Sequence, residues 1–323
     1  MKILGRLVIT VLVAFGCHAA AAAQPYPTKP IRVIVTFPPG GQTDVVARLI
    51  QPHLEARLGQ PVVIDNRPGA GGTIGVDAVA KAAPDGHVLA VGPMGALTVN
   101  MSLQDKMPYD TLKDLAPISL LTSTPFVMAA PLSFAASHVG EVIALAKSNA
   151  ANLSIGHGGN GSAMHLTALL FNHMAGVNIP LVPYRGSGLA LNDVVAGHIP
   201  LAVGDTTSAL TVLRTGKAKA LGVTSLKRDR SLPDVPTFAE SGLPGFESMG
   251  WFGMVAPAGT PPAIIASLNA AIASALKDTA IVERLRAIGA EPVPSTPAEF
   301  AEFIRREIDK WARVTAQSGF KAN

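Results

Sequence analysis

Two glycine-rich segments, Phe37–Asp44 and Gly158–His165, hold the residues best suited to chemistry, and each lies between an apolar run and a helical pattern. Glycines let the backbone approach a ligand closely and expose its N–H groups. The N-terminus of a helix adds unpaired donors and a positive dipole, which favour a carboxylate or another anion. Two such segments facing each other would hold one anion from both sides. For the first segment alone, capping of the helix by Thr43 or Asp44 is the simpler interpretation.

A third glycine-rich segment, Asn66–Thr73, has the same context but follows the second expected strand. Its Gly69 and Gly71 resemble the start of a dinucleotide-binding fingerprint, but the third glycine falls at Gly75, one residue late. Capping by a hydroxyl and close packing of a helix account for this segment more simply. Nucleotide binding is therefore not expected.

Catalytic and metal-binding patterns are weak. Ser162 and His165 lie one helical turn apart, which fits a hydrolase pair but also fits a helix cap and its neighbour. The sequence contains no Gly-x-Ser-x-Gly segment and no His-Glu-x-x-His segment. Its one cysteine, Cys17, lies near the N-terminus. We predict no catalytic residue, no metal site and no cofactor.

Short apolar runs alternate with helical patterns around these segments. In the first set, strands are expected over 31–36, 61–65 and 87–91, and helices over 43–58 and 73–82. In the second set, helices are expected over 139–150, 162–174 and 187–195, and strands over 153–155, 179–182 and 199–203. Such βα units predict parallel sheets covered by helices, and two sets predict two α/β lobes.

Two extended apolar segments, 117–131 and 218–225, are interpreted as the connections between the lobes. The proline-rich segment 233–261 and the last two helices would then return to lobe one. The final helix is expected over 297–316, with Trp311 on its apolar face. The predicted organisation is a signal peptide at 1–23, lobe one at 24–124 and 226–323, and lobe two at 125–225.

The first 23 residues are typical of a secretory signal peptide. Lys2 and Arg6 precede a short apolar run from Leu7 to Phe15, and Ala19–Ala23 offers small residues for cleavage. The run is short for a membrane-spanning helix, and the residues before Cys17 fit a lipidation motif poorly.

Composition and charge limit the partners. Of the 323 residues, 48% are hydrophobic and 15% are charged, which suits two ordered domains and argues against disorder. The segment 1–23 holds two of the 26 basic residues and none of the 22 acidic ones, so the remainder has a formal charge of +2. That mild charge gives no reason to expect nucleic acid or an anionic membrane surface as a partner.

Motifs along essentially the whole chain after residue 23 resemble those of the substrate-binding proteins of tripartite tricarboxylate transporters, the Bug family. They are, in order, Tyr26–Arg32, Phe37–Asp44, Asn66–Gly72, Pro84–Gly86, Met107–Asp110, Val182–Gly188, Pro233–Thr237 and Ala256–Pro261. Their number, order and spacing carry the resemblance, since no single motif is decisive.

The resemblance implies an α/β fold of the two-lobed Venus-flytrap, periplasmic binding protein type, with mostly parallel sheets flanked by helices. It implies a periplasmic solute-binding protein, not an enzyme, that captures a small organic carboxylate in the cleft between the lobes. The expected partners are the membrane subunits of a tripartite tricarboxylate transporter, and a monomer that binds no nucleic acid is expected. The matching ligand-binding positions are Phe37, Gly40, Gly41, Thr43 and Asp44 in lobe one, and Asn160, Gly161, Ser162, Ala163 and His165 in lobe two.

Three further candidates follow strands. Thr98 and Asn100 come after the third strand and are expected to line the cleft, and Asp205 is expected to contact the far end of the ligand. Most other matching motifs, including Val182–Gly188, are interpreted as turns and packing elements.

The sequence departs from the family pattern at several positions, so the ligand cannot be transferred from relatives. His157 replaces a small polar residue and Val203 a frequent Phe, both next to the expected cleft; further departures are His87, Met101 and Pro200. Val203 and Asp205 favour a monocarboxylate, an amino-bearing acid or an aromatic acid over citrate. Because backbone groups would grip the ligand, modest pH dependence is expected. Two alternatives stay open, a ligand-sensing partner of a signalling receptor and a hydrolase using Ser162 and His165.

Overall fold

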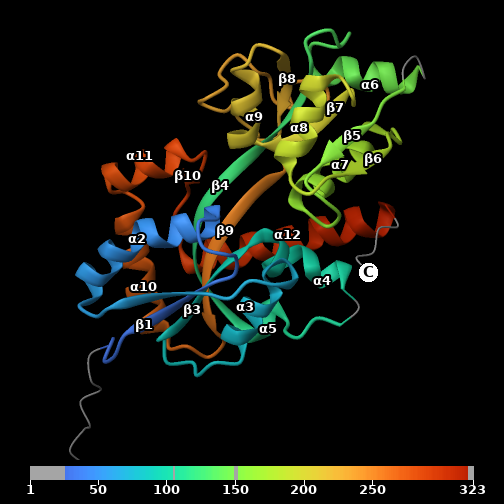
Figure 1. Cartoon of the computed structure of the whole chain (residues 1–323). Helices are drawn as coiled ribbons and strands as arrows, with labels where there is room; N and C mark the ends of the chain where they lie inside the picture. Colours follow the sequence, from blue (N-terminus) through green and yellow to red (C-terminus); the bar gives the residue numbers. More distant parts are fainter. Residues whose placement is uncertain (1–25, 105, 149–151, 319–323) are drawn as a thin grey trace, which may run out of the picture.

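A computed structural model of the chain describes residues 26–104, 106–148 and 152–318 (Figure 1). The signal peptide predicted at 1–23, with Cys17, lies outside these residues. Within the described ranges no single helix is both long and apolar enough to cross a membrane, although the bent pair Pro262–Ala275 and Thr279–Ala287 passes that test by length and composition.

Lobe one is built on three parallel strands in the order β2–β1–β3. The strands are β1 (Ile31–Val35), β2 (Val62–Asn66) and β3 (Val88–Pro93). Helices α2 (Gln42–Leu58) and α3 (Thr73–Ala80) connect them, with the short helical segment η1 (Ala70–Gly72) before α3. Strand β1 is almost wholly buried, as expected of a parallel strand covered by helices on both faces.

Lobe two repeats this construction with three parallel strands in the order β7–β5–β6. The strands are β5 (Ile155–His157), β6 (Leu181–Pro183) and β7 (Leu201–Asp205). The helices are α6 (Val139–Lys147), α7 (Ala163–Ala175), α8 (Ser187–Ala196) and α9 (Thr206–Leu213). The parallel βα units predicted for both lobes are therefore confirmed.

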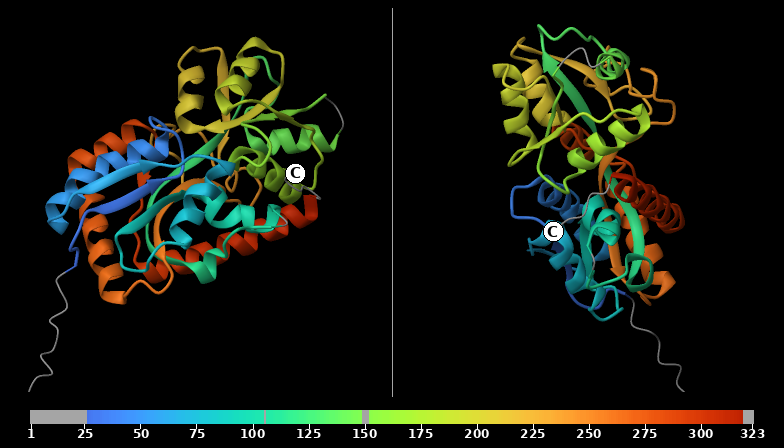
Figure 2. Two further views of the ribbon diagram at one scale, coloured as in Figure 1. Left: turned by 60° about the horizontal axis from the view of Figure 1, so that its bottom comes forward. Right: turned by 90° about the vertical axis from the view of Figure 1, so that its right-hand side faces the viewer.

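Two long antiparallel strands, β4 (Leu115–Pro131) and β9 (Met249–Pro257), join the lobes (Figures 1 and 2). The first part of β4 pairs with β9, and its last residues, from Phe126 on, pair with β7 and with β8 (Ala218–Val223). The sheet as a whole is mixed, since the strands of each βα set are parallel and the joining strands are antiparallel to their neighbours.

The chain returns to lobe one later than the sequence predicts. Strand β8, expected to be a connection, pairs with the end of β4, and the chain after it stays against lobe two. The amide of Phe238 donates to the carbonyl oxygen of Val223, and its ring lies 5.8 Å from that of Phe171 in α7. Burial of these aromatic rings in lobe two explains the delay. The lobe boundaries stay a prediction, and these contacts favour a return to lobe one at the start of β9 over one at residue 226.

The C-terminal elements reconnect the two lobes. Helices α10 (Pro262–Ala275) and α11 (Thr279–Ala287) contact α2. The long helix α12 (Pro297–Ser318) contacts α7 of lobe two and also the segments η2 (Gly95–Val99) and α4 (Asn100–Leu103) of lobe one. The remaining short elements are α5 (Thr111–Asp114) and β10 (Glu291–Pro292).

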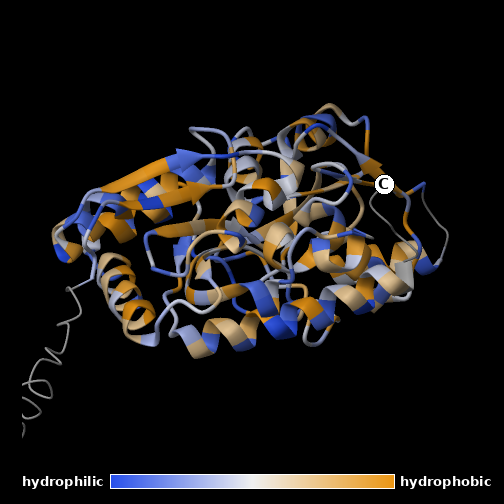
Figure 3. Ribbon diagram, turned by 90° about the horizontal axis from the view of Figure 1, so that it is seen from below, coloured by the Kyte–Doolittle hydropathy of each residue, from blue (hydrophilic) through white to orange (hydrophobic). Residues whose placement is uncertain are grey.

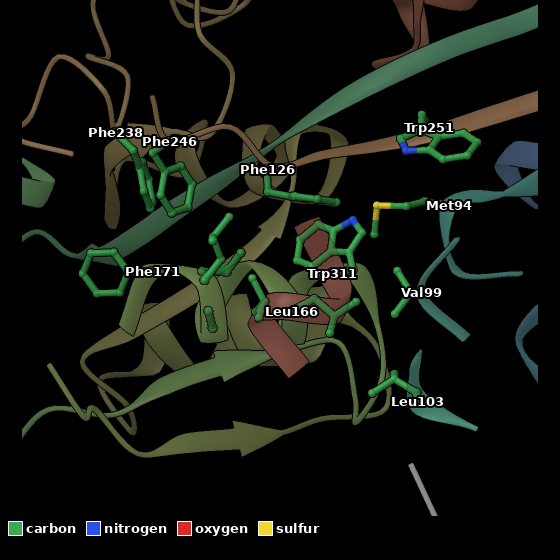
Figure 4. Close-up of a cluster of buried hydrophobic side chains, with 14 of the residues drawn as sticks. Met94, Val99, Leu103, Phe126, Leu166, Phe171, Phe238, Phe246, Trp251 and Trp311 are labelled. Atoms are coloured by element: carbon green, nitrogen blue, oxygen red, sulfur yellow. The ribbon is translucent and has the colours of Figure 1, made fainter. Parts of the chain in front are cut away.

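One hydrophobic cluster runs through both lobes along α12. Trp311, which is fully buried, lies between Leu166 of α7 and the pair Met94 and Val99 of lobe one (Figure 4). The strands are predominantly hydrophobic in the hydropathy colouring, whereas the helices carry both colours (Figure 3). Helix α12 therefore packs its apolar face against both lobes at once.

Candidate functional site

The first glycine loop, residues 37–41, leads from β1 into α2. Gly41 precedes the helix with φ −69° and ψ 161°, and no described side chain caps the helix. Asp44, only 2% exposed, instead bonds outside the helix, where its Oδ2 accepts the Gly40 amide at 2.9 Å. The interpretation that Thr43 or Asp44 caps α2 is therefore wrong. The first amides of α2 are left without a side-chain acceptor, as an anion site requires.

Asp44 ties this loop to its surroundings. Its Oδ1 accepts the side-chain amide of Asn66 at 2.9 Å, and Arg48 donates to both carboxylate oxygens at 2.9 Å. The same Asn66 amide donates to the carbonyl oxygen of Phe37 at 3.0 Å. Burial by itself would raise the pKa of Asp44, but the bonds from Arg48 and the other donors outweigh it, so the pKa lies below its ordinary value. The Asp44 carboxylate therefore uses its hydrogen bonds to stabilise the conformation of the loop.

Replacement of Asp44 is expected to loosen the loop and destabilise the protein. Asp44→Asn should reduce the free energy of unfolding by about 1–3 kcal/mol, because buried donors lose their charged acceptor. A carboxyl group whose pKa is lowered by folding stabilises the folded state at pH values above its ordinary pKa. This stabilisation is lost as the pH falls through the lowered pKa. Urea unfolding between pH 7 and pH 3 should therefore show a smaller acid loss in Asp44→Asn than in the wild type.

The matched control is Glu302→Gln, which removes an exposed acid that pairs with arginines three and four residues on. Exposed pairs of this kind contribute about 0–1 kcal/mol. Equal effects of the two variants would show that Asp44 does not organise the loop.

The second glycine loop, residues 158–162, leads from β5 into α7. Gly159 and Gly161 have φ of +115° and +74°, which favours glycine at both positions. Ser162 caps α7, since its Oγ accepts the amide of His165 at 3.2 Å. This geometry supports the capping interpretation of Ser162 and His165 over a nucleophile and its base.

Two buried histidines underlie this loop. The rings of His157 and His165 stack with centroids 4.4 Å apart and an interplanar angle of 21°. Gly161 donates its amide to Nδ1 of His165 at 3.1 Å, and the amide nitrogen of Gly159 lies 3.3 Å from Nδ1 of His157. Burial and, secondarily, the neighbouring His157 lower the pKa of His165 to about 4. Burial also lowers the pKa of His157, so both rings are neutral near pH 7.

Asp205 joins two helices of lobe two. Its Oδ1 accepts the amide of Ser208 at 2.8 Å, which caps α9, and its Oδ2 accepts the hydroxyls of Ser208 at 2.8 Å and Ser187 at 2.6 Å. Val203 is fully buried in β7. The preference for a monocarboxylate or an amino or aromatic acid, which rested on these two side chains, therefore loses its basis.

The N-terminus of α8 joins the second glycine loop. A Cβ added at Gly158 would lie 3.3 Å from the amide nitrogen of Ser187, so the beginning of this loop lies against the start of α8. Ser187 lies in Val182–Gly188, which the sequence predicts to be a turn and packing element, and it is not among the predicted site residues. Its place at the carboxyl end of β6, a neighbour of β5, is the signal that finds it.

Thr98 and Asn100 differ in their surroundings. Thr98 is fully buried and donates its hydroxyl to the carbonyl oxygen of Met94 at 2.7 Å, so it does not present this group at the surface. Asn100 donates to the hydroxyl of Thr73 at 3.0 Å, at the start of α3. The segment before α3 is packed closely, as predicted, because a Cβ at Gly72 would lie 3.1 Å from Thr36. The predicted hydroxyl cap of α3 is not found among the described residues.

The lobes meet in a few polar contacts close to the start of α2. The carbonyl oxygen of Ile288 accepts the Thr207 hydroxyl of α9 at 2.9 Å and lies 3.5 Å from Nε2 of Gln42. Two cavities of about 270 and 180 Å³ lie elsewhere, beside α12, and share Glu247 and Lys310. Within the part of the chain that the structure describes, neither is lined by a predicted site residue, and no group of three or more His, Cys, Asp or Glu could hold a metal ion.

Two α/β lobes joined by long antiparallel strands, each with a glycine loop at the carboxyl ends of its parallel strands, define a periplasmic binding protein. Residues 46–320 match the family described as "Tripartite tricarboxylate transporter family receptor", and the chain belongs to that family. The predicted resemblance and fold class are therefore confirmed, and members of this family are periplasmic solute-binding proteins.

Individual relatives are similar to this chain over almost its whole length. Protein BugT of Bordetella pertussis is 40% identical over 307 residues, which are 95% of this chain and 94% of BugT. The structure of MatC from Rhodopseudomonas palustris with bound malate is 39% identical with a TM-score of 0.72, covering 90% of this chain and 99% of MatC. The R. palustris protein Rpa4515 with adipate is 35% identical with a TM-score of 0.76, covering 92% and 99% of the two chains.

Proposed function

We propose that the mature protein captures a small organic carboxylate between its two glycine loops in the periplasm and delivers it to the membrane subunits of a tripartite tricarboxylate transporter, without catalysing a reaction. The observation that supports this most strongly is the pair of glycine loops at the starts of α2 and α7, in a chain whose relatives hold malate and adipate. The contacts would come from loop backbone, the first amides of α2, the hydroxyl of Ser162 and the amide groups at the starts of α7 and α8.

In this proposal the residues of the two loops divide into two groups. The groups that would meet a ligand are the amides of Thr43, Asn160 and Ala163 and the side chains of Phe37 and Asn160, because the amides of Gly40, Gly41 and Gly161 already donate within their loops. Asp44, His165 and Asp205 hold those groups in place, because their polar atoms already bond the loops and the helix starts.

The ligand would act by favouring the closed arrangement of the lobes. It contacts loops of both lobes only when they are close, so its binding free energy shifts the population toward closure. Strands β4 and β9, which join the lobes, are the elements that bend during such a motion. Malate and adipate are both dicarboxylates, which places dicarboxylates first among the ligands to test.

A dicarboxylate is expected to stabilise the mature protein against heat. Ligand at about 100 times its dissociation constant adds roughly 2.7 kcal/mol to the stability of the folded state. For a protein of this size, that corresponds to a rise in Tm of about 5–10 °C. Differential scanning fluorimetry of residues 24–323 against malate, adipate and other carboxylates measures this rise.

Dimethyl adipate is the matched control, because it keeps the carbon chain and lacks both charges. Neutral sugars and nucleotides serve as further controls. A rise in Tm with dimethyl adipate equal to that with adipate, or a rise with sugars or nucleotides only, would exclude a carboxylate clamp.

A further inference from the structure

The stacked pair His157 and His165 has features that a simple packing role leaves unexplained. His157 ends strand β5, two residues later than the predicted end of that strand, and its side chain is fully buried. Its Nε2 has no hydrogen-bond partner among residues 26–104, 106–148 and 152–318. His165 stands in the first turn of α7, is 4% exposed and accepts the amide of Gly161.

The bonds from the loop require neutral rings. An imidazole nitrogen accepts a hydrogen bond only when it carries no proton. Protonation of Nδ1 of His165 would turn this acceptor into a donor and break its bond with Gly161. It would also place a cation 4.4 Å from the second ring in a buried site, where charge is disfavoured by lost hydration.

His157 fits its site best as the neutral tautomer with the proton on Nδ1. It then donates to the carbonyl oxygen of Gly159 at 3.1 Å and carries no N–H at the buried Nε2. A doubly protonated ring would put a charged N–H at the buried Nε2, where the described residues provide no acceptor. The neutral forms are therefore the ones that this part of the structure accommodates.

Of the titratable groups on the elements around the two rings, Tyr184 and Asp205 have other partners. Tyr184, which follows β6, donates to Asp193 of α8 at 2.7 Å, and Asp205 accepts from two serine hydroxyls. Arg185 is exposed. The remaining charged groups packed near α7 lie around its far end and are Glu247, Glu307, Lys310 and Arg313.

We propose that the neutral His157–His165 stack positions the second glycine loop for its ligand, so that binding is constant near neutral pH and is lost when the stack protonates in acid. This inference rests on the proposed function, in which that loop contacts the carboxylate. It goes beyond the expectation of modest pH dependence, which assumed that no titrating residue grips the ligand. A cationic His165 that paired with the ligand would behave oppositely, because its affinity would fall as the pH rises through about 6.5.

The amide resonances of Gly159 and Gly161 test the positioning role without a ligand. In nitrogen-15 NMR spectra of the mature chain, the Gly161 amide should change with the protonation of His165, at a midpoint well below about 6.5. His165→Gln should remove this titration. His157→Asn should move the midpoint to higher pH, because it removes the second ring and its repulsion.

His173→Gln is the matched control, since it removes an exposed histidine from the same helix and should leave the Gly161 titration unchanged. A Gly161 amide that is insensitive to pH between about 7.5 and 3.5 in the wild type would overturn the proposal. A titration that persists unchanged in His165→Gln would also overturn it.

Calorimetric titration with malate and with adipate tests the effect on binding. The wild-type affinity should stay within about twofold from pH 7.5 to pH 6. Between pH 6 and pH 4, the factor by which the wild-type affinity falls should be at least about three times the factor for His165→Gln. Protonation of the ligand affects both proteins equally and cancels in this comparison. An affinity that falls from pH 6 to pH 7.5 in the wild type only would overturn the proposal. If neither acid binds at any pH, the proposed ligand class fails, and the amide titration still decides the role of the stack.

Discussion

A Gly41→Asp, Ser162→Asp double variant is expected to fold like the wild type and to lose at least about 100-fold in affinity for a carboxylate ligand. Each new carboxylate stands at the start of a helix, where the ligand's own charge is proposed to bind. Two like charges about 5 Å apart at an effective dielectric constant of about 20 repel by roughly 3 kcal/mol. Isothermal titration calorimetry with the acid that gives the largest thermal shift measures the loss.

Both positions tolerate aspartate. Gly41 has an extended backbone open to any residue, and a Cβ there would make only an ordinary contact, 3.4 Å from the carbonyl oxygen of Pro38. Ser162 is a helix cap, and aspartate caps helices about as well as serine. The variant should therefore match the wild type in Tm without ligand, or exceed it.

The matched control is Gly41→Asn, Ser162→Asn, which has nearly the same shape and capping ability but no charge. It should retain affinity within about tenfold of the wild type, since it adds bulk without repulsion. Equal affinities of the aspartate and asparagine variants would show that the starts of α2 and α7 do not meet the ligand's carboxylate.

A Glu307→Ala variant is expected to lose about 3 kcal/mol of unfolding free energy, because it leaves two buried indole N–H groups without an acceptor. Glu307 is 7% exposed, and its Oε2 accepts Trp311 at 2.9 Å and Trp251 at 3.3 Å. Its other oxygen pairs with Lys310. These indoles belong to α12 and to the joining strand β9, so the loss falls on the connection between the lobes. A decrease in Tm of about 6–12 °C corresponds to it.

Two further variants separate the contributions. Glu307→Gln keeps an acceptor for the indoles and should cost only about 1 kcal/mol. Lys310→Met keeps the indole bonds and removes the ion pair, together with the contact of the ammonium group with the Trp311 ring and its 3.5 Å contact with the carbonyl oxygen of Glu247. Its lysine is 25% exposed, so this variant should cost about 1 kcal/mol. If Lys310→Met destabilised the protein as much as Glu307→Ala, the indole bonds would have no part in holding α12.

The repeated βα units follow from the sequence because their signals are local. An apolar run, a glycine turn and a helical pattern lie within about 30 residues of one another, and each βα unit is built from such neighbours. The glycine loops at the ends of β1 and β5 follow for the same reason, since a parallel strand must be followed by a turn into its helix. The family resemblance includes these glycine loops among its motifs and extends over essentially the whole chain after residue 23.

The tertiary structure alone determined which side chains lie at the glycine loops and which bond to or pack against other elements. Phe238 packs on Phe171 and Trp251 bonds to Glu307, and both contacts join residues far apart in the chain. The bond of Ser187 in α8 to Asp205 at the end of β7 joins two elements whose meeting no local pattern predicts. The bond of the Thr98 hydroxyl to Met94 and the stacking of His157 on His165 arise inside single lobes, from the way that the chain folds around η2 and around the second glycine loop. Hydrophobic periodicity records which face of an element is buried, but it holds no information about what that face meets, so these features required the folded structure.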